Sequence, residues 1–137
     1  MSYDLLVFEK TKAPQTRPEF LKWFNEEVQR GEEPGSQSIS TASPALRNWF
    51  MEMKDTFPPM NGLYAPSIEQ INADACLESY MTDYSISGGM IYACFAWSLA
   101  DEAYGTVRKA AQKHGVGFFD VSSEDGDIIL PDGTRVT

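Results

Sequence analysis

The chain has 137 residues and a hydrophobic content of 42%, including 8 Phe, 6 Tyr and 3 Trp. These values predict one folded domain with its own core, over residues 1–137, and exclude a disordered chain. The net charge is −9, from 11 basic and 20 acidic residues. This charge disfavours nucleic acid and anionic membranes as partners, because binding to phosphates requires a basic surface.

The composition also argues against membrane insertion and against disulfide or zinc chemistry. No run of about 18 apolar residues occurs, and Asp4 and Glu9 lie where a signal peptide would carry basic residues. We therefore expect a cytoplasmic location. Cys76 and Cys94 are too few for a disulfide framework or a closed zinc site, so we expect free thiols, no metal and no cofactor.

The first half of the chain predicts one strand and two helices. Residues 3–9 are apolar on both alternate faces, which is typical of a central strand. Thr16 and Glu19 form a capping box for a helix that ends near Arg30. A second helix is predicted over 44–57, where apolar residues recur at helical spacing before two prolines.

The second half predicts four strands and two further helices. In chain order these are a short helix near 68–75, strands at 80–86 and 90–97, a helix over 99–114, and strands at 117–121 and 127–130. Glycines between the first two of these strands favour a hairpin. Ser98 and Asp101 form the capping pattern of the long helix, and Gly115 ends it.

This order predicts an α+β fold. Without the extra helix and the C-terminal strand, the remainder is the β-α-β-β-α-β arrangement of ferredoxin-like domains. Such a sheet carries helices on one face only, and here the two expected central strands are apolar on both faces. The second face therefore has to be covered by the chain's own residues, by a second copy in a homodimer or by another partner.

Residues that could carry chemistry are few. His114 lies beside Lys113 in the last turn of a predicted helix, where a positive charge suits the helix dipole, so we favour a structural role. The acidic segment 121–132 has some spacing of a calcium loop, but predicted strands flank it and an acidic turn is the better interpretation. Carboxylate pairs such as Asp101 with Glu102 could serve as acid and base, but the first turn of a helix explains them more simply.

The acidic residues are unevenly distributed. Between Lys54 and Arg108 the chain has no Lys or Arg but contains Asp55, Glu69, Asp74, Glu78, Asp83, Asp101 and Glu102. Solubility and recognition of a basic partner both explain this distribution.

Two loops add candidates for contact with a partner. Glu32 and Glu33 follow the end of the first predicted helix, where the dipole disfavours acids, so they are either incidental or serve recognition. Met60 follows Pro58 and Pro59, which restrict the backbone and present either a chain-exit turn or a rigid contact loop. The candidate partner-binding residues are Glu32, Glu33, Met60, Asp83 and Tyr84.

Several segments resemble a group of small bacterial cytosolic proteins. These segments are YDLLVFE at 3–9, ALRNWFMEM at 45–53, FPPMNG at 57–62, IYACFAWS at 91–98 and EAYGTVRKAAQKHGVGFFDVSS at 102–123. That group looks like immunity proteins of secreted toxins, of the type VI or polymorphic kind. The resemblance implies a protein without an active site that binds and neutralises a cognate, basic toxin domain by occluding its cleft. The alternative is a small ferredoxin-like enzyme or ligand-binding regulatory protein, as a monomer or a dimer.

Overall fold

The computed structural model describes residues 2–31, 42–60, 64–86, 89–123 and 126–136. Its elements are β1 (Tyr3–Phe8), α1 (Arg17–Gly31), α2 (Pro44–Thr56), α3 (Ile68–Ala73), α4 (Leu77–Tyr80), β2 (Asp83–Ile86), β3 (Met90–Phe95), the 3-10 helix η2 (Trp97–Leu99), α5 (Ala100–His114), β4 (Gly117–Phe119) and β5 (Ile128–Ile129). Within the described ranges, no helix is long and apolar enough to cross a membrane.

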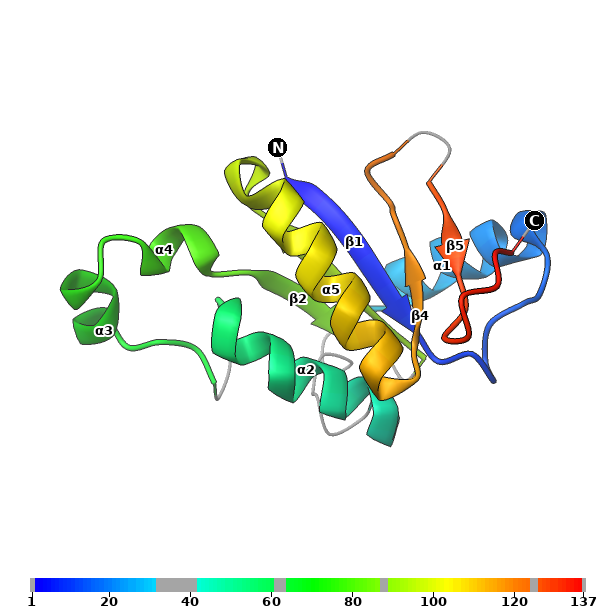
Figure 1. Cartoon of the computed structure of the whole chain (residues 1–137), viewed down its shortest axis with the longest axis horizontal. Helices are drawn as coiled ribbons and strands as arrows, with labels where there is room; N and C mark the ends of the chain where they lie inside the picture. The colour runs from blue at the N-terminus through cyan, green and yellow to red at the C-terminus, as the bar shows by residue number, and fades with distance from the viewer. Residues whose placement is uncertain (1, 32–41, 61–63, 87–88, 124–125, 137) are drawn as a thin grey trace.

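One five-stranded sheet runs through the molecule in the order β2-β3-β1-β4-β5, with every neighbouring pair antiparallel (Figure 1). β1 pairs with β3 along its whole length, from Tyr3 opposite Phe95 to Phe8 opposite Met90. The prediction that these two strands are central is confirmed, as is the α+β class.

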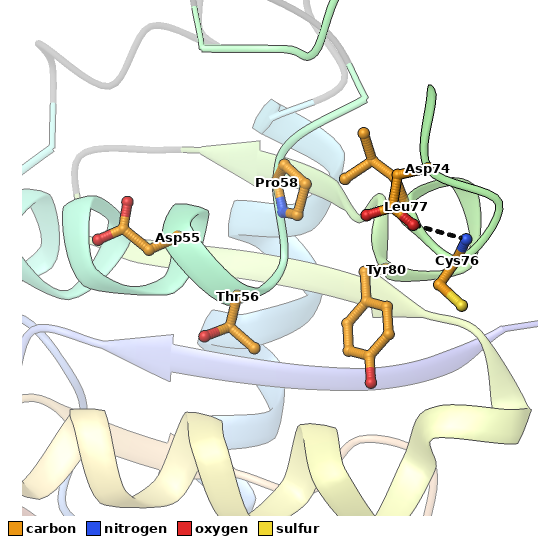
Figure 2. A pocket seen from close by; sticks show the side chains of 7 residues that line it. All are labelled: Asp55, Thr56, Pro58, Asp74, Cys76, Leu77 and Tyr80. Carbon is orange, nitrogen blue, oxygen red and sulfur yellow. Dashed lines mark hydrogen bonds between the residues drawn. The ribbon is translucent and has the colours of Figure 1, made fainter. Parts of the chain in front are cut away.

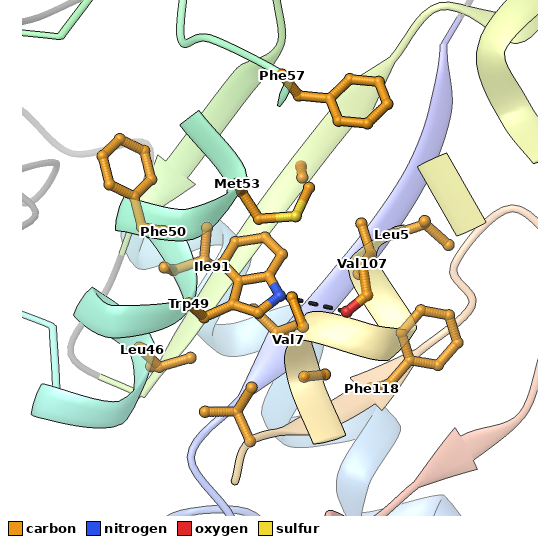
Figure 3. Packing of buried hydrophobic residues seen from close by; sticks show 14 of the residues in the cluster. Leu5, Val7, Leu46, Trp49, Phe50, Met53, Phe57, Ile91, Val107 and Phe118 are labelled. Atoms are coloured by element: carbon orange, nitrogen blue, oxygen red, sulfur yellow. Dashed lines mark hydrogen bonds between the residues drawn. The ribbon is translucent and has the colours of Figure 1, made fainter. Parts of the chain in front are cut away.

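The larger part of the core lies between the sheet and the helices α2 and α5, which pack on the same face (Figures 1 and 3). Trp49 of α2 is fully buried there, among side chains of β1, β3 and α5. Its indole N–H donates a hydrogen bond of 3.3 Å to the carbonyl oxygen of Val107. This bond satisfies the polar atom of the largest buried side chain and joins α2 to α5.

The other face of the sheet is covered by α1 (Figure 1). Phe20 of α1 is fully buried, with its ring centroid 4.8 Å from that of Phe8 and 5.4 Å from that of Phe119. Phe24 of α1 stacks on Tyr92 at 6.0 Å. The apolar second face that the sequence predicts is thus covered by a helix of the same chain.

Three predicted boundaries are wrong. Tyr80 ends α4 rather than beginning a strand, because Thr82 pairs with Pro58 and Met60 and the ladder with β3 starts only at Asp83. Trp97 belongs to the 3-10 turn that leads into α5. Ser98 does not cap α5, whose N-cap is Leu99 without a side-chain hydrogen bond. The predicted end of α5 is confirmed, since Gly115 takes the left-handed conformation with φ of 71°.

Candidate functional site

The segment 64–80, which we call the acidic arm, projects from the body of the molecule between α2 and β2 (Figure 1). It contains α3 and α4, and neither helix has a buried residue. Ser67 caps α3 with a reciprocal capping box, accepting from the Gln70 N–H at 3.1 Å while its own N–H donates to the Gln70 side chain at 2.9 Å. Local hydrogen bonds therefore shape α3, while Tyr64 and Tyr80 of the arm pack on the core rings of Phe50 and Phe57.

Hydrogen bonds also attach the arm to the body. Near its first end, the Met60 N–H donates to the Thr82 carbonyl at 3.0 Å and the Thr82 N–H donates to Pro58 at 2.8 Å. At its other end, the Tyr80 hydroxyl donates to the Glu102 carboxylate of α5 at 2.7 Å, which raises the pKa of the tyrosine. The arm is thus fixed at both ends while α3 and α4 stay on the surface.

Exposed acids and exposed apolar side chains lie together on the arm. Glu69, Asp74 and Glu78 are exposed, and the sequence between Lys54 and Arg108 supplies no basic residue to neutralise them. Ile68 is 77% exposed at the start of α3, and Met60 is 48% exposed just before the arm. Negative charge around apolar groups is a composition that suits a basic protein partner.

A cavity of about 250 Å³ separates the end of α2 from the arm (Figure 2). Asp55 and Thr56 of α2 line one side, and Asp74 and Cys76 of the arm line the other. One carboxylate oxygen of Asp74 accepts the Cys76 N–H at 2.9 Å, which holds the turn between α3 and α4. The cavity opens between two carboxylates from different elements, a feature that no sequence pattern indicated.

The predicted contact residues fall in different places. Glu32 and Glu33 lie outside the described residues. Met60 and Asp83 are exposed. Tyr84 points to the opposite face from Asp83, as alternation along a strand requires.

The surroundings of Tyr84 are those of a packing residue. Its ring lies 5.1 Å from that of Phe50 and 6.1 Å from that of Trp49, and its hydroxyl donates to the Phe57 carbonyl at 2.8 Å. Burial raises the pKa of this hydroxyl. We therefore do not count Tyr84 among the residues available to a partner, because its ring packs on Phe50 and Trp49 and its hydroxyl bonds to Phe57.

A polar cluster that the sequence did not reveal lies on the α1 side of the sheet. Asp4 accepts hydrogen bonds of 2.5 Å from both the Ser2 and Tyr92 hydroxyls. Strand register places Cys94 opposite Asp4 on one side and opposite Asp83 on the other. Burial, followed by the charge of Asp4, raises the pKa of the Cys94 thiol to about 12. This thiol is protonated at neutral pH, so it is a poor nucleophile.

His114 takes part in a charged contact between α5 and α2. Glu52 lies 2.6 Å from the Lys113 ammonium and 3.4 Å from His114 Nε2. The hydrogen bond from Lys113 is the main cause that lowers the pKa of Glu52. This contact agrees with a structural role for the histidine.

Metal-ligating groups do not gather in the described ranges, where no three His, Cys, Asp or Glu side chains could hold an ion. In the segment with calcium-like spacing, Asp132 accepts the N–H of Thr134 at 2.9 Å and Asp127 lies 3.7 Å from Arg135. Comparison of the chain with protein-family models, with curated proteins and with solved structures found no match.

Proposed function

We propose that this chain is an immunity protein that binds a basic bacterial toxin domain in the cytoplasm and neutralises it by occluding its cleft. The observation that carries the proposal is the acidic arm, where exposed Glu69, Asp74 and Glu78 share one segment with exposed Ile68 and no basic residue occurs. The resemblance of the sequence to immunity proteins supports the same function.

The arm has the physical properties that such binding needs. Its acids, in a chain of net charge −9, attract a basic partner before contact and raise the association rate. Ile68 and Met60 supply apolar area that becomes buried on docking. The absence of buried residues in α3 and α4 allows the arm to adjust to a cleft without disturbing the core.

The proposed function needs no reaction. Among the groups described above, the Cys94 thiol is held protonated and His114 is engaged with Glu52. These two contacts weigh against the enzymatic alternative. We propose inhibition by binding alone.

We also propose a ferredoxin-like core for the fold, formed by β1, α2, β2, β3, α5 and β4. Support comes from the central position of β1 and β3 and from the packing of α2 and α5 on one face. In this arrangement α1 is the extra helix, and β5 is the added strand.

Growth rescue tests the function. The neighbouring genes are first searched for a basic toxin domain, which the proposal predicts. The chain is co-expressed with that domain, and colony counts are compared with those of cells that express the toxin alone. The natural chain is expected to restore growth. The Glu69→Gln/Glu78→Gln variant is expected to protect at least tenfold fewer cells, because it removes two charges of the arm.

The matched control is Glu19→Gln/Glu26→Gln, which removes two exposed charges from α1. It should protect as well as the natural chain, with equal amounts of folded protein checked by circular dichroism. Toxicity that the natural chain does not relieve, or equal losses in both variants, would overturn the proposal.

A further inference from the structure

A second cavity, of about 340 Å³, is lined by residues that follow β1 and β5. These two segments lie at the end of the molecule away from the acidic arm (Figure 1). Two hydrogen-bonded turns form its walls. After β1, the Ala13 N–H donates to the Lys10 carbonyl at 3.4 Å. After β5, the Leu130 N–H donates to the Thr134 carbonyl at 2.7 Å. The backbone therefore holds both walls in place before any ligand arrives.

The lining of this cavity is basic and apolar. Lys10 and Arg135 both line it, together with the polar side chains of Gln15 and Thr134, and none of its lining residues is acidic. The apolar lining residues are Ala13, Pro14, Leu130 and Val136. The charged residues that line the cavity are thus both basic, in a chain with 20 acidic and 11 basic residues.

Two acids, Asp132 and Asp127, interact with the basic lining residues only weakly. Asp132 accepts the Thr134 N–H at 2.9 Å; this bond, and then the charge of Lys10, lowers the pKa of Asp132. The closest approach of Arg135 to Asp127 is 3.7 Å, and the arginine side chain remains 63% exposed. An exposed ion pair of this kind contributes little free energy, so the guanidinium is available to a better anionic partner.

We propose that this cavity binds a small organic anion through a carboxylate or phosphate group placed between Lys10 and Arg135. A guanidinium donates two parallel hydrogen bonds to such a group, and the ammonium adds a point charge. The amide of Gln15, two residues before α1, adds a donor near the positive end of the helix dipole. Leu130 and Val136 contact the apolar part of the ligand. This binding site is separate from the partner surface and does not depend on it.

Thermal unfolding with defined probes tests this site. The probes are inorganic phosphate, benzoate and the neutral analogue benzamide, each at an ionic strength held constant with NaCl. At least one anion is expected to raise the midpoint temperature saturably by about 4 °C or more, while benzamide does not. A response to phosphate alone identifies a phosphate ligand, and a response to benzoate identifies a carboxylate with an apolar body. No saturable response to either anion would overturn the proposal.

A charge-matched pair of variants locates the site. The Lys10→Gln/Arg135→Gln variant should bind the anion at least tenfold more weakly, whereas Lys22→Gln/Lys109→Gln, which removes two exposed charges elsewhere, should bind as the natural chain does. Equal responses in all three proteins would contradict the proposal. If the first variant does not fold, amide chemical shifts in the natural chain decide the question. Shifts confined to residues 10–15 and 130–136 support the site, and shifts confined to other segments overturn it.

Discussion

At the residue scale, two glycines differ in the room that surrounds them. A Cβ added at Gly117 would lie 2.2 Å from the Phe8 ring, which is itself fixed by the ring of Phe20 at a centroid distance of 4.8 Å. Gly105 lies inside α5, and a Cβ added there would meet nothing within 4 Å. One position has no room for a methyl group and the other has ample room.

Substitution of alanine for glycine should therefore change the free energy of unfolding in opposite directions at these two positions. Gly117→Ala should lower the free energy of unfolding by about 1–3 kcal/mol, because the Phe8 ring has to shift. Gly105→Ala should raise it by about 0.5–1 kcal/mol, because alanine favours the helix. Urea denaturation measures both changes in the free energy of unfolding, provided that the variants keep the m-value of the natural chain. Changes of the same sign in the two variants would contradict the described packing.

The partly buried carboxylate of Asp120 has an electrostatic cost for the folded state. One of its carboxylate oxygens is buried without a hydrogen-bond partner, and burial is the main cause that raises its pKa. An acid whose pKa is raised by folding favours the folded state at low pH, and this contribution is lost as the pH rises through the folded-state value. The charged form of Asp120 therefore weakens the fold at neutral pH.

Asp120→Asn should raise the free energy of unfolding at about pH 7, by up to about 1 kcal/mol because the carboxylate is only partly shielded from solvent. Asparagine keeps an oxygen for the backbone N–H groups of Ser122 and Ser123, which bond the carboxylate in the natural chain. The advantage should disappear near pH 3, where the aspartate is protonated. Denaturation curves across this pH range measure it, and an advantage that is constant with pH would rule out a titrating Asp120 as its source.

At the element scale, the acidic arm and α2 differ in how their helix caps connect to the core. Ser67 caps α3, which has no buried residue, whereas Ser43 caps α2 through the Leu46 N–H at 3.3 Å, and α2 buries four residues in the core. Ser43 also donates a hydrogen bond of 2.7 Å to Glu9. Loss of the Ser67 cap should therefore destabilise only α3, whereas loss of the Ser43 cap should lower the stability of the whole fold.

Ser43→Ala is expected to lower the free energy of global unfolding by about 1 kcal/mol. Ser67→Ala should leave that value within about 0.3 kcal/mol, while it speeds amide exchange in α3 about fivefold. Hydrogen exchange measured by mass spectrometry, together with urea denaturation, separates the two effects. A global loss in Ser67→Ala equal to that in Ser43→Ala would show that the arm is part of the cooperative core.

The sequence predicts those elements whose apolar pattern agrees with their packing. The stripe that includes Trp49 and Met53 predicts α2, and the two-sided apolar runs predict β1 and β3 as central strands. α4 is missed because its four residues bury nothing and so carry no periodic pattern. The cluster of Asp4 with Tyr92 depends on pairing between strands far apart in the chain, and no local signal reveals that register.

The candidate surface, too, is predicted from the sequence only in part. Exposed acids and the absence of bases between Lys54 and Arg108 are visible in the sequence, whereas the cavity beside Asp74 needs the turn that brings the arm against α2. Tyr84 follows Asp83 in the chain, yet the two side chains lie on opposite faces of the sheet. Composition predicts the charge of the surface, and tertiary structure decides which neighbours share it.

At the scale of the whole molecule, the acidic arm projects at one end of the long axis (Figure 1). The segments after β1 and β5, whose residues line the second cavity, lie toward the other end (Figure 1). We expect a basic partner to approach the arm, because its exposed acids attract such a partner and no Lys or Arg occurs between Lys54 and Arg108. Orientation before contact raises the rate of association more than it slows dissociation.

The association rate with the purified basic toxin domain encoded beside the gene, measured by stopped-flow fluorescence, tests this account most directly. Between about 20 and 500 mM NaCl the rate should fall at least tenfold, because salt screens the attraction. At low salt, Glu69→Gln/Glu78→Gln should lower the rate about two- to fivefold, and Glu19→Gln/Glu26→Gln should leave it unchanged. No binding, a rate independent of salt, or equal rates for the two variants would contradict recognition of a basic toxin by the acidic arm.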